Sequence, residues 1–213
     1  MKTDFHKRRL PHLQPLGGTF FVTFNLVGSI PDEVLNRWRV EFKTLKDIIL
    51  RESKTISLDL EKLGKLDFAK KDKFFDTYTG GNHHLKSDSL AEIVANALHH
   101  WDGKYFELFC YCIMSNHVHV VFRLFDTEEI DKPRYLQEVM HSIKLFSAIK
   151  CNKLLGKTGA FWHHESYDRL VRDDAELKRI MQYIVNNPVK AGLCKEMKDW
   201  KWSYVKHIYN DIM

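Results

Sequence analysis

Residues 111–125, YCIMSNHVHVVFRLF, decide how the rest of the sequence is interpreted. The pattern predicts the end of one strand, a tight turn at Ser115, and a second strand that begins at His117. Because strand side chains alternate between faces, His117 and His119 share one face with Val121, and the apolar residues between them point into a core. Two imidazoles one residue apart can converge on one ion, so the pair is a candidate divalent-metal site.

Other interpretations of this hairpin compete with the metal pair. An H-x-H pair alone is a weak signal, and the chain has 12 histidines, so chance pairs are expected. A zinc site that adds Cys110 and Cys112 is the main rival. Structural zinc sites usually space their cysteines about two to four residues apart, whereas C-x-C within a strand is typical of two small buried residues.

The composition predicts a globular protein of one domain. The chain has 213 residues, of which 44% are hydrophobic and 13% aromatic, enough for a substantial core. No apolar run reaches the roughly 18 residues of a membrane helix, and the segment MKTDFHKRRLPH lacks an apolar signal core, so we expect a cytoplasmic protein with no membrane partner. The four cysteines are expected to be reduced. A net charge of +5 permits a nucleic-acid partner without establishing one.

The first half of the chain predicts an arm, a strand and a helical insertion. Residues 1–16 form a basic arm in which Arg8 and Arg9 could contact phosphate, although a solvated tail is an equal alternative. Gly17 and Gly18, which would let a backbone or ligand come close, precede a β-rich segment. Residues from about 31 to 103 are expected to be a helical insertion between the first and second sheet strands, with short helices and loops over 53–82.

The segment 134–155 has the spacing of a helix. Its apolar residues, with Phe146 and Ile149 among them, are expected to face inward. Its outer face carries Lys144 and Lys150, which are either a solvated surface or a surface that tracks phosphates.

Residues 161–171 are expected to form a strand, and a helix follows it. Asp173 and Glu176 make a capping box at the start of that helix, and the proline after Asn187 is expected to end it. Tyr183 and Asn187 lie four residues apart and therefore on one helix face. Tyr183 is a nucleophile candidate and Asn187 a ligand for a hard cation, although a tyrosine at a core boundary is more commonly structural.

Four segments together resemble the REP-associated tyrosine transposases, relatives of the single-tyrosine HUH transposases. They are GGTFFVTF, MSNHVHVVF, FWHHESYDRLVRDDAELKRIMQYIVNNPVKAGL and DWKWSY. The resemblance extends from Arg8 to Tyr204 and is weakest over 50–85. The family usually has a proline before N-H-x-H, where this chain has Ser115.

The resemblance implies an α+β fold, a ferredoxin-like or RRM-like sandwich with a central antiparallel sheet, helices on one face and a helical insertion. His117 and His119 match the metal ligands of the HUH enzymes, and Tyr183 matches the nucleophile. Asn187 matches the position of a third, amide-bearing ligand, for which Asn186 is the alternative.

The implied activity is Mg²⁺- or Mn²⁺-dependent cleavage and joining of single-stranded DNA beside hairpins, through a 5′-phosphotyrosine. The implied partner is a REP-like palindrome, bound by a nucleoid-associated monomer or homodimer. Residues assigned to DNA contact are Arg8, Arg9, Gly17, Gly18, Lys144, Lys150 and Arg169. The alternative is a hairpin-binding module without catalysis, derived from such an enzyme.

Overall fold

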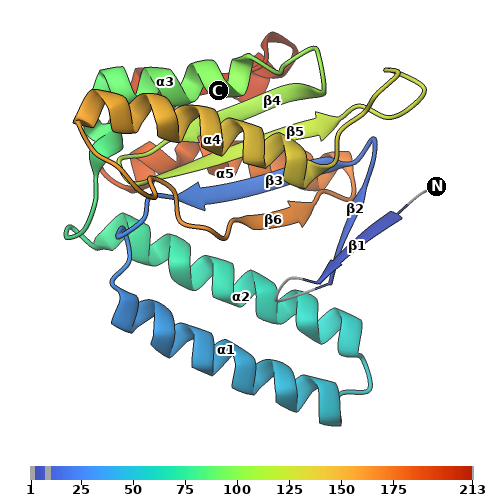
Figure 1. The fold of residues 1–213 in the computed structure, drawn as a ribbon. Helices are drawn as coiled ribbons and strands as arrows, with labels where there is room; N and C mark the ends of the chain where they lie inside the picture. The colour runs from blue at the N-terminus through green and yellow to red at the C-terminus, as the bar shows by residue number, and fades with distance from the viewer. Residues whose placement is uncertain (1–2, 8–10, 213) are drawn as a thin grey trace.

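The computed structural model describes residues 3–7 and 11–212, so Arg8 and Arg9 lie outside the described part. It has the predicted α+β architecture, in which five strands form one antiparallel sheet in the order β6-β3-β5-β4-β7 (Figure 1). These strands are β3 (Thr19–Asn25), β4 (Phe106–Ile113), β5 (His117–Leu124), β6 (Tyr167–Leu170) and β7 (Ser203–Val205). Two further strands, β1 (Thr3–Lys7) and β2 (Pro11–Pro15), pair only with each other. No helix in the described part is long and apolar enough to cross a membrane.

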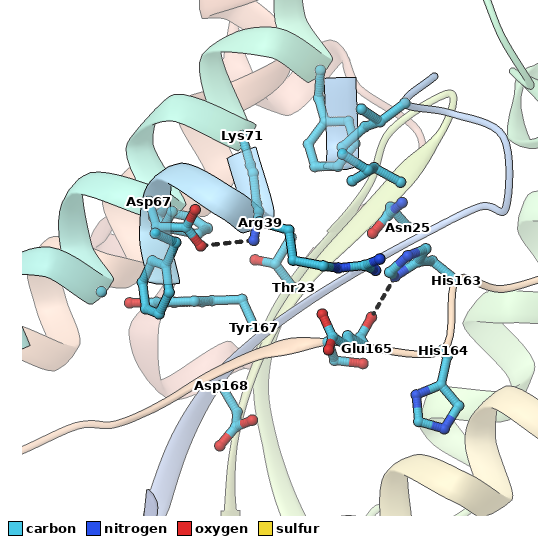
Figure 2. Close-up of a pocket in the computed structure, with 17 residues that line it drawn as sticks. Thr23, Asn25, Arg39, Asp67, Lys71, His163, His164, Glu165, Tyr167 and Asp168 are labelled. Atoms are coloured by element: carbon cyan, nitrogen blue, oxygen red, sulfur yellow. Dashed lines mark hydrogen bonds and ion pairs between the residues drawn. The ribbon is translucent and has the colours of Figure 1, made fainter. Parts of the chain in front are cut away.

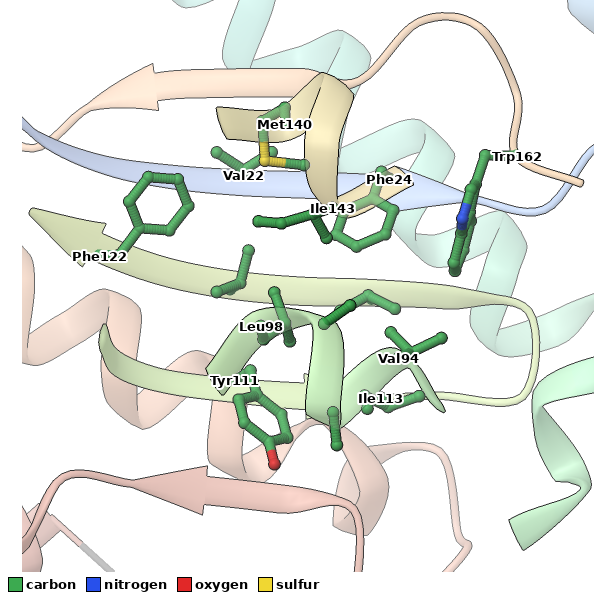
Figure 3. Packing of buried hydrophobic residues seen from close by; sticks show 14 of the residues in the cluster. Val22, Phe24, Val94, Leu98, Tyr111, Ile113, Phe122, Met140, Ile143 and Trp162 are labelled. Carbon is green, nitrogen blue, oxygen red and sulfur yellow. The ribbon is translucent and has the colours of Figure 1, made fainter. Parts of the chain in front are cut away.

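Helices α3 (Asp88–His99) and α4 (Leu136–Leu155) cover one face of the sheet and enclose the main core (Figure 3). The alternation predicted for β5 is confirmed, because Val118, Val120 and Phe122 are fully buried in this core. At its edge the Trp162 indole packs on Phe24, with ring centroids 4.7 Å apart. This face therefore supplies most of the apolar burial and leaves the opposite face for helices α5 (Asp174–Lys190) and α2 (Ile56–Thr77).

The buried stripe of α4 differs from the prediction. Phe146 and Ile149 are 47% and 58% exposed, whereas Ser147 and Cys151 are buried. From Ile143 the inward positions continue at steps of four, and a polar residue occupies one of them. Ser147 fits there because its hydroxyl donates to the Ile143 carbonyl (2.7 Å) and accepts the Trp162 indole N–H (2.9 Å).

Helix α5 (Asp174–Lys190) packs on the second face, the one that carries His117 and His119. Its predicted start is confirmed, because the Asp173 carboxylate accepts the Glu176 backbone N–H (2.7 Å). The predicted end is wrong, since Pro188 lies inside the helix, which continues to Lys190. A proline near a helix end removes one donor, a smaller loss than in mid-helix.

Helices α1 (Asp32–Glu52) and α2 (Ile56–Thr77) form a hairpin beside the sheet, between β3 and α3 in the chain (Figure 1). The prediction of short helices and loops over 53–82 is wrong, because α2 is one helix of 22 residues. Leu60, Leu63 and Phe75 are buried along one side of it. The lysines that interrupt this apolar pattern in the sequence lie on other sides of α2. They pair with acidic residues one turn away, as Lys71 does with Asp67 (2.7 Å).

Candidate active site

The two histidines of β5 point to the same place. Their Nε2 atoms lie 3.0 Å apart, and the side chains are only 1% and 0% exposed. The other ring nitrogens are each held by a neighbour: His117 Nδ1 by Asn116 Oδ1 and His119 Nδ1 by Thr23 Oγ1, both at 2.7 Å. Such outer hydrogen bonds orient both Nε2 atoms toward a common point, as in metal-binding histidine pairs.

A carboxylate from α2 completes the cluster. Asp72 Oδ1 lies 3.4 Å from His119 Nε2, and ligand atoms of Asp72, His117 and His119 all lie within 4.8 Å of one another. The sequence analysis missed Asp72, which falls where the family resemblance is weakest. A signal was present, because Asp72 is spaced four residues after Phe68 and three before Phe75, on the apolar side of its helix.

Burial and neighbouring charges set the protonation states of these groups. Burial, followed by the proximity of His119, lowers the pKa of His117 well below its usual value. Burial raises the pKa of Asp72, but hydrogen bonds with His119 and Tyr183 and charge interactions with His119 and His117 outweigh that effect and hold the pKa below its usual value. At neutral pH the cluster therefore combines a neutral imidazole with a charged carboxylate, the forms in which these side chains bind metal ions.

Helix α5 brings Tyr183 and Asn187 to the same cluster. The Tyr183 hydroxyl donates to Asp72 Oδ1, and Asn187 Nδ2 lies 3.1 Å from His119 Nε2 and 3.4 Å from the Tyr183 oxygen. Asn187 is fully buried, whereas Asn186 is exposed, so of the two only Asn187 can join the histidines. Asn187 Oδ1 is buried without a hydrogen-bond partner among the described residues.

The donor set fits a divalent cation. Two imidazoles and a carboxylate converge, and the unpartnered Asn187 Oδ1 would reach the cluster if the amide turned over, since the two ends of an amide are nearly equal in shape. By contrast Cys110 and Cys112 pack among apolar side chains of α5, and burial raises the pKa of Cys112 to about 12. The histidine–carboxylate cluster could therefore hold a metal ion, and protonated thiols are poor partners for it.

Residues 82–187, about half of the chain, match the family model described as "Transposase IS200 like". The chain belongs to the IS200-like transposase family. A Haemophilus influenzae protein described as a REP-associated tyrosine transposase is 26% identical over 105 residues, which are 46% of this chain and 58% of that relative. The match thus spans little more than half of the relative's length.

A solved structure of a REP-associated tyrosine transposase bound to a REP hairpin has the same fold. Its TM-score is 0.55 at 15% identity, covering 95% of this chain and 86% of that one. The predicted fold class and family resemblance are therefore confirmed. The matched family segment contains β5 and most of α5, and thus both histidines, Tyr183 and Asn187.

A basic cavity of about 520 Å³ lies beside Tyr183, between α2 and α5 in this transposase-family fold. Its lining includes four cationic residues, Lys65, Arg169, Arg172 and Arg179, and two acidic ones, Asp173 and Glu176, so positive charge is in excess. Arg169, predicted to contact DNA, is thus placed near Tyr183, where its guanidinium pairs with Glu176. The strand predicted over 161–171 is shorter than expected, because continuous pairing with β3 covers Tyr167–Leu170, while Trp162 forms an isolated bridge to Leu26.

Other residues assigned to DNA contact lie away from the histidines. The Lys144 ammonium donates to the carbonyls of His163 (2.7 Å) and His164 (3.1 Å), so it holds the loop that leads into β6. Lys150 is exposed on α4, over the other face of the sheet. Neither side chain belongs to the cluster of Asp72, His117 and His119.

The glycine pair lies at the end of β3 that is remote from His117. Thr19 pairs with Arg123, whereas Asn25, at the opposite end of β3, pairs with His117. Gly17 has a φ of +74°, and a Cβ on Gly18 would lie 2.9 Å from the Pro15 carbonyl oxygen. The local backbone thus requires glycine at both positions, independently of any ligand.

Proposed function

We propose that this protein is a metal-dependent single-stranded DNA endonuclease and strand transferase, with Tyr183 as nucleophile. The observation that carries the proposal is one cluster in which the Tyr183 hydroxyl meets the Asp72 carboxylate beside two converging imidazoles. A nucleophile, a proton acceptor and metal-ligand atoms are the parts that phosphoryl transfer to tyrosine requires. Membership of a transposase family supports the same reaction class.

His117, His119, Asp72 and, after an amide turn, Asn187 would hold Mg²⁺ or Mn²⁺. Such an ion withdraws charge from the scissile phosphate and lowers the barrier to attack. Imidazole ligands favour Mn²⁺ in affinity, while the carboxylate and amide oxygens also suit Mg²⁺.

The tyrosine is held protonated until attack. Burial and the adjacent Asp72 carboxylate raise the pKa of Tyr183 above its usual value. Asp72 Oδ1 accepts the hydroxyl hydrogen bond and would take the proton as the Tyr183 oxygen bonds to phosphorus. The bond from phosphorus to the 3′-oxygen breaks, and that oxygen leaves as a 3′-hydroxyl after taking a proton from solvent.

The product is a 5′-phosphotyrosine, in which the new phosphoester bond to Tyr183 replaces the broken bond to the 3′-oxygen. Another 3′-hydroxyl can therefore attack it and join two strands without ATP. The proposed substrate is single-stranded DNA beside a hairpin. The cationic cavity next to Tyr183 supports a phosphate backbone there, and the solved relative with the same fold binds a REP hairpin.

The decisive experiment uses 3′-labelled single-stranded hairpin DNA from the flanks of the gene, with Mn²⁺, on denaturing gels. We expect a shifted band, the covalent adduct, for the wild type and none for Tyr183→Phe, which removes one oxygen and keeps the ring. Tyr167→Phe is the matched control, since Tyr167 lines the same basic cavity but lies outside the metal-binding cluster. An adduct that survives in Tyr183→Phe would show that another residue is the nucleophile.

A hairpin-binding module without catalysis is the second candidate. The observation in its favour is the near-complete burial of both histidines, which leaves no exposed nitrogen for a phosphate in this state. Hairpin binding with no adduct on any flanking sequence, in Mn²⁺ or Mg²⁺, would favour the binding module.

A further inference from the structure

A second cavity, of about 390 Å³, lies between the α1–α2 hairpin and the strands β3 and β6 (Figure 2). We call it the hairpin cavity. The aromatic side chains of Phe42, Phe68, Phe75 and Tyr167 line it. In Figure 2 the Arg39 side chain reaches from α1 toward His163 and Glu165. The volume falls in the range of about 300–1,000 Å³ that is usual for small-molecule sites.

The charges that line the hairpin cavity argue against a phosphate as its occupant. Among the described lining residues two cations, Arg39 and Lys71, face three carboxylates, those of Asp67, Glu165 and Asp168. Positive charge is therefore not in excess, in contrast with the basic cavity beside Tyr183. Aromatic walls together with donors and acceptors suit a flat heterocycle, which stacks by its faces and forms hydrogen bonds at its edges.

The hairpin cavity shares walls with the candidate active site. Phe75 lines it and stacks on the His117 ring, with centroids 4.6 Å apart and planes 19° apart. Thr23 lines it and holds His119 Nδ1. A group bound in the cavity would therefore lie next to the residues proposed to act on a phosphate.

A stacked pair of rings separates the hairpin cavity from the basic cavity. Phe68 and Tyr167, with centroids 4.3 Å apart and planes 26° apart, line both cavities. On one side of this pair the surface is cationic and contains Tyr183, and on the other it is aromatic and has no positive excess. A nucleotide strand has the same division, with charged phosphates on one side and uncharged bases on the other.

We propose that the hairpin cavity binds one unpaired nucleobase of the DNA strand next to the scissile phosphate, and so selects the base at that position. This inference rests on the proposed function and adds a base-specific subsite to it. Arg39 would donate to acceptor atoms on the base edge, while Glu165 would accept from amino groups. The α1–α2 hairpin, which forms one side of the cavity, lies before residue 82 and so outside the matched family segment.

The test uses hairpin DNA in which 2-aminopurine replaces each base of the unpaired flank in turn. Binding is measured in EDTA by anisotropy and by 2-aminopurine emission, so no cleavage is needed. We expect one flank position whose emission is quenched by the wild type, because stacking on aromatic rings quenches this base. Loss of that contact should weaken binding of the DNA hairpin that carries the unpaired flank about tenfold. It should leave binding of a DNA hairpin without a flank unchanged.

Two variants remove the subsite in different ways. Gly64→Leu places a side chain on the buried α2 residue that lines the cavity, and leucine forms helices better than glycine. Arg39→Ala removes an exposed rim cation without altering the core. Arg37→Ala is the matched control, because it removes the same charge from an exposed position on α1 that does not line the cavity. Thermal unfolding checks that each variant is folded.

The proposal requires that Gly64→Leu abolish the quenching, that Arg39→Ala weaken it, and that Arg37→Ala preserve it. The absence of a quenched position in the wild type, or equal quenching in Gly64→Leu, would overturn it. Displacement of the labelled strand by free deoxynucleoside monophosphates at similar concentration would overturn the assignment to a strand. If Gly64→Leu abolishes the quenching but the wild type never forms a covalent adduct, the base subsite is supported and the proposed nuclease activity is not.

Discussion

The Tyr183 hydroxyl donates a hydrogen bond to the Asp72 carboxylate and so joins α5 to α2, across 111 residues of sequence. The same carboxylate faces His119 Nε2 at 3.4 Å. One side chain thus connects the candidate nucleophile to the candidate metal ligands. Since Asp72 comes from the α1–α2 hairpin, that hairpin supplies part of the candidate active site.

Asp72→Asn should lower Mn²⁺ affinity by roughly 10- to 100-fold and reduce adduct formation in proportion, because it removes the negative charge while conserving size. Isothermal titration with Mn²⁺ measures the first effect, and 3′-labelled DNA on denaturing gels the second. Asp76→Asn is the control, since Asp76 pairs with Lys190 (2.9 Å) and lies outside the cluster of Asp72, His117 and His119. Unchanged Mn²⁺ affinity in Asp72→Asn would remove Asp72 from the ligand set.

His117→Ala and His119→Ala should each abolish adduct formation while leaving the fold and most DNA affinity intact. A ligand that binds only the folded state raises its melting temperature, so Mn²⁺ should stabilise the wild type and neither variant. Differential scanning fluorimetry with and without Mn²⁺ measures this, and His99→Ala, at an exposed histidine beside Tyr111, is the control. Unfolding of either variant at room temperature would instead indicate that the two histidines stabilise the core and do not bind a metal ion.

DNA binding should fall steeply as salt rises, with a preference for flanked hairpins over blunt duplex. Lys150→Ala should reduce the slope of log affinity against log salt by about 0.9 if Lys150 contacts one phosphate. Anisotropy titrations at several salt concentrations measure the slope. Lys153→Ala on the same helix is the comparison, and equal slopes for Lys150→Ala and the wild type would exclude a phosphate contact at Lys150.

Asp173→Ala should lower the free energy of unfolding by about 1 kcal/mol, because the Glu176 backbone N–H loses its cap. Urea denaturation measures the change. Asp174→Ala is the control, since Asp174 is in the first turn but does not accept that hydrogen bond. Neither aspartate belongs to the cluster of Asp72, His117 and His119, so metal affinity should be unchanged in both variants.

Much of the candidate site could be predicted because its parts are local in sequence. The period of two in β5 places His117 and His119 on one face of that strand. The helical period places Tyr183 and Asn187 on one face of α5. Asp72 could not be placed in this way, since its position depends on how a whole helix docks against a sheet. The burial of Ser147 in place of Phe146 also depends on a distant partner, the Trp162 indole.

The burial of the two imidazoles has a consequence for the timing of the reaction. With 1% and 0% exposure, and with Phe75 stacked on His117, neither ring offers a surface that a DNA phosphate could contact. The proposed reaction therefore requires a second, open conformation in which the Phe75 ring no longer covers His117, and the population of that conformation would limit the apparent affinity for substrate. A DNA strand that binds the open form better would shift the equilibrium toward it, whereas other DNA would meet the closed protein and would not be nicked.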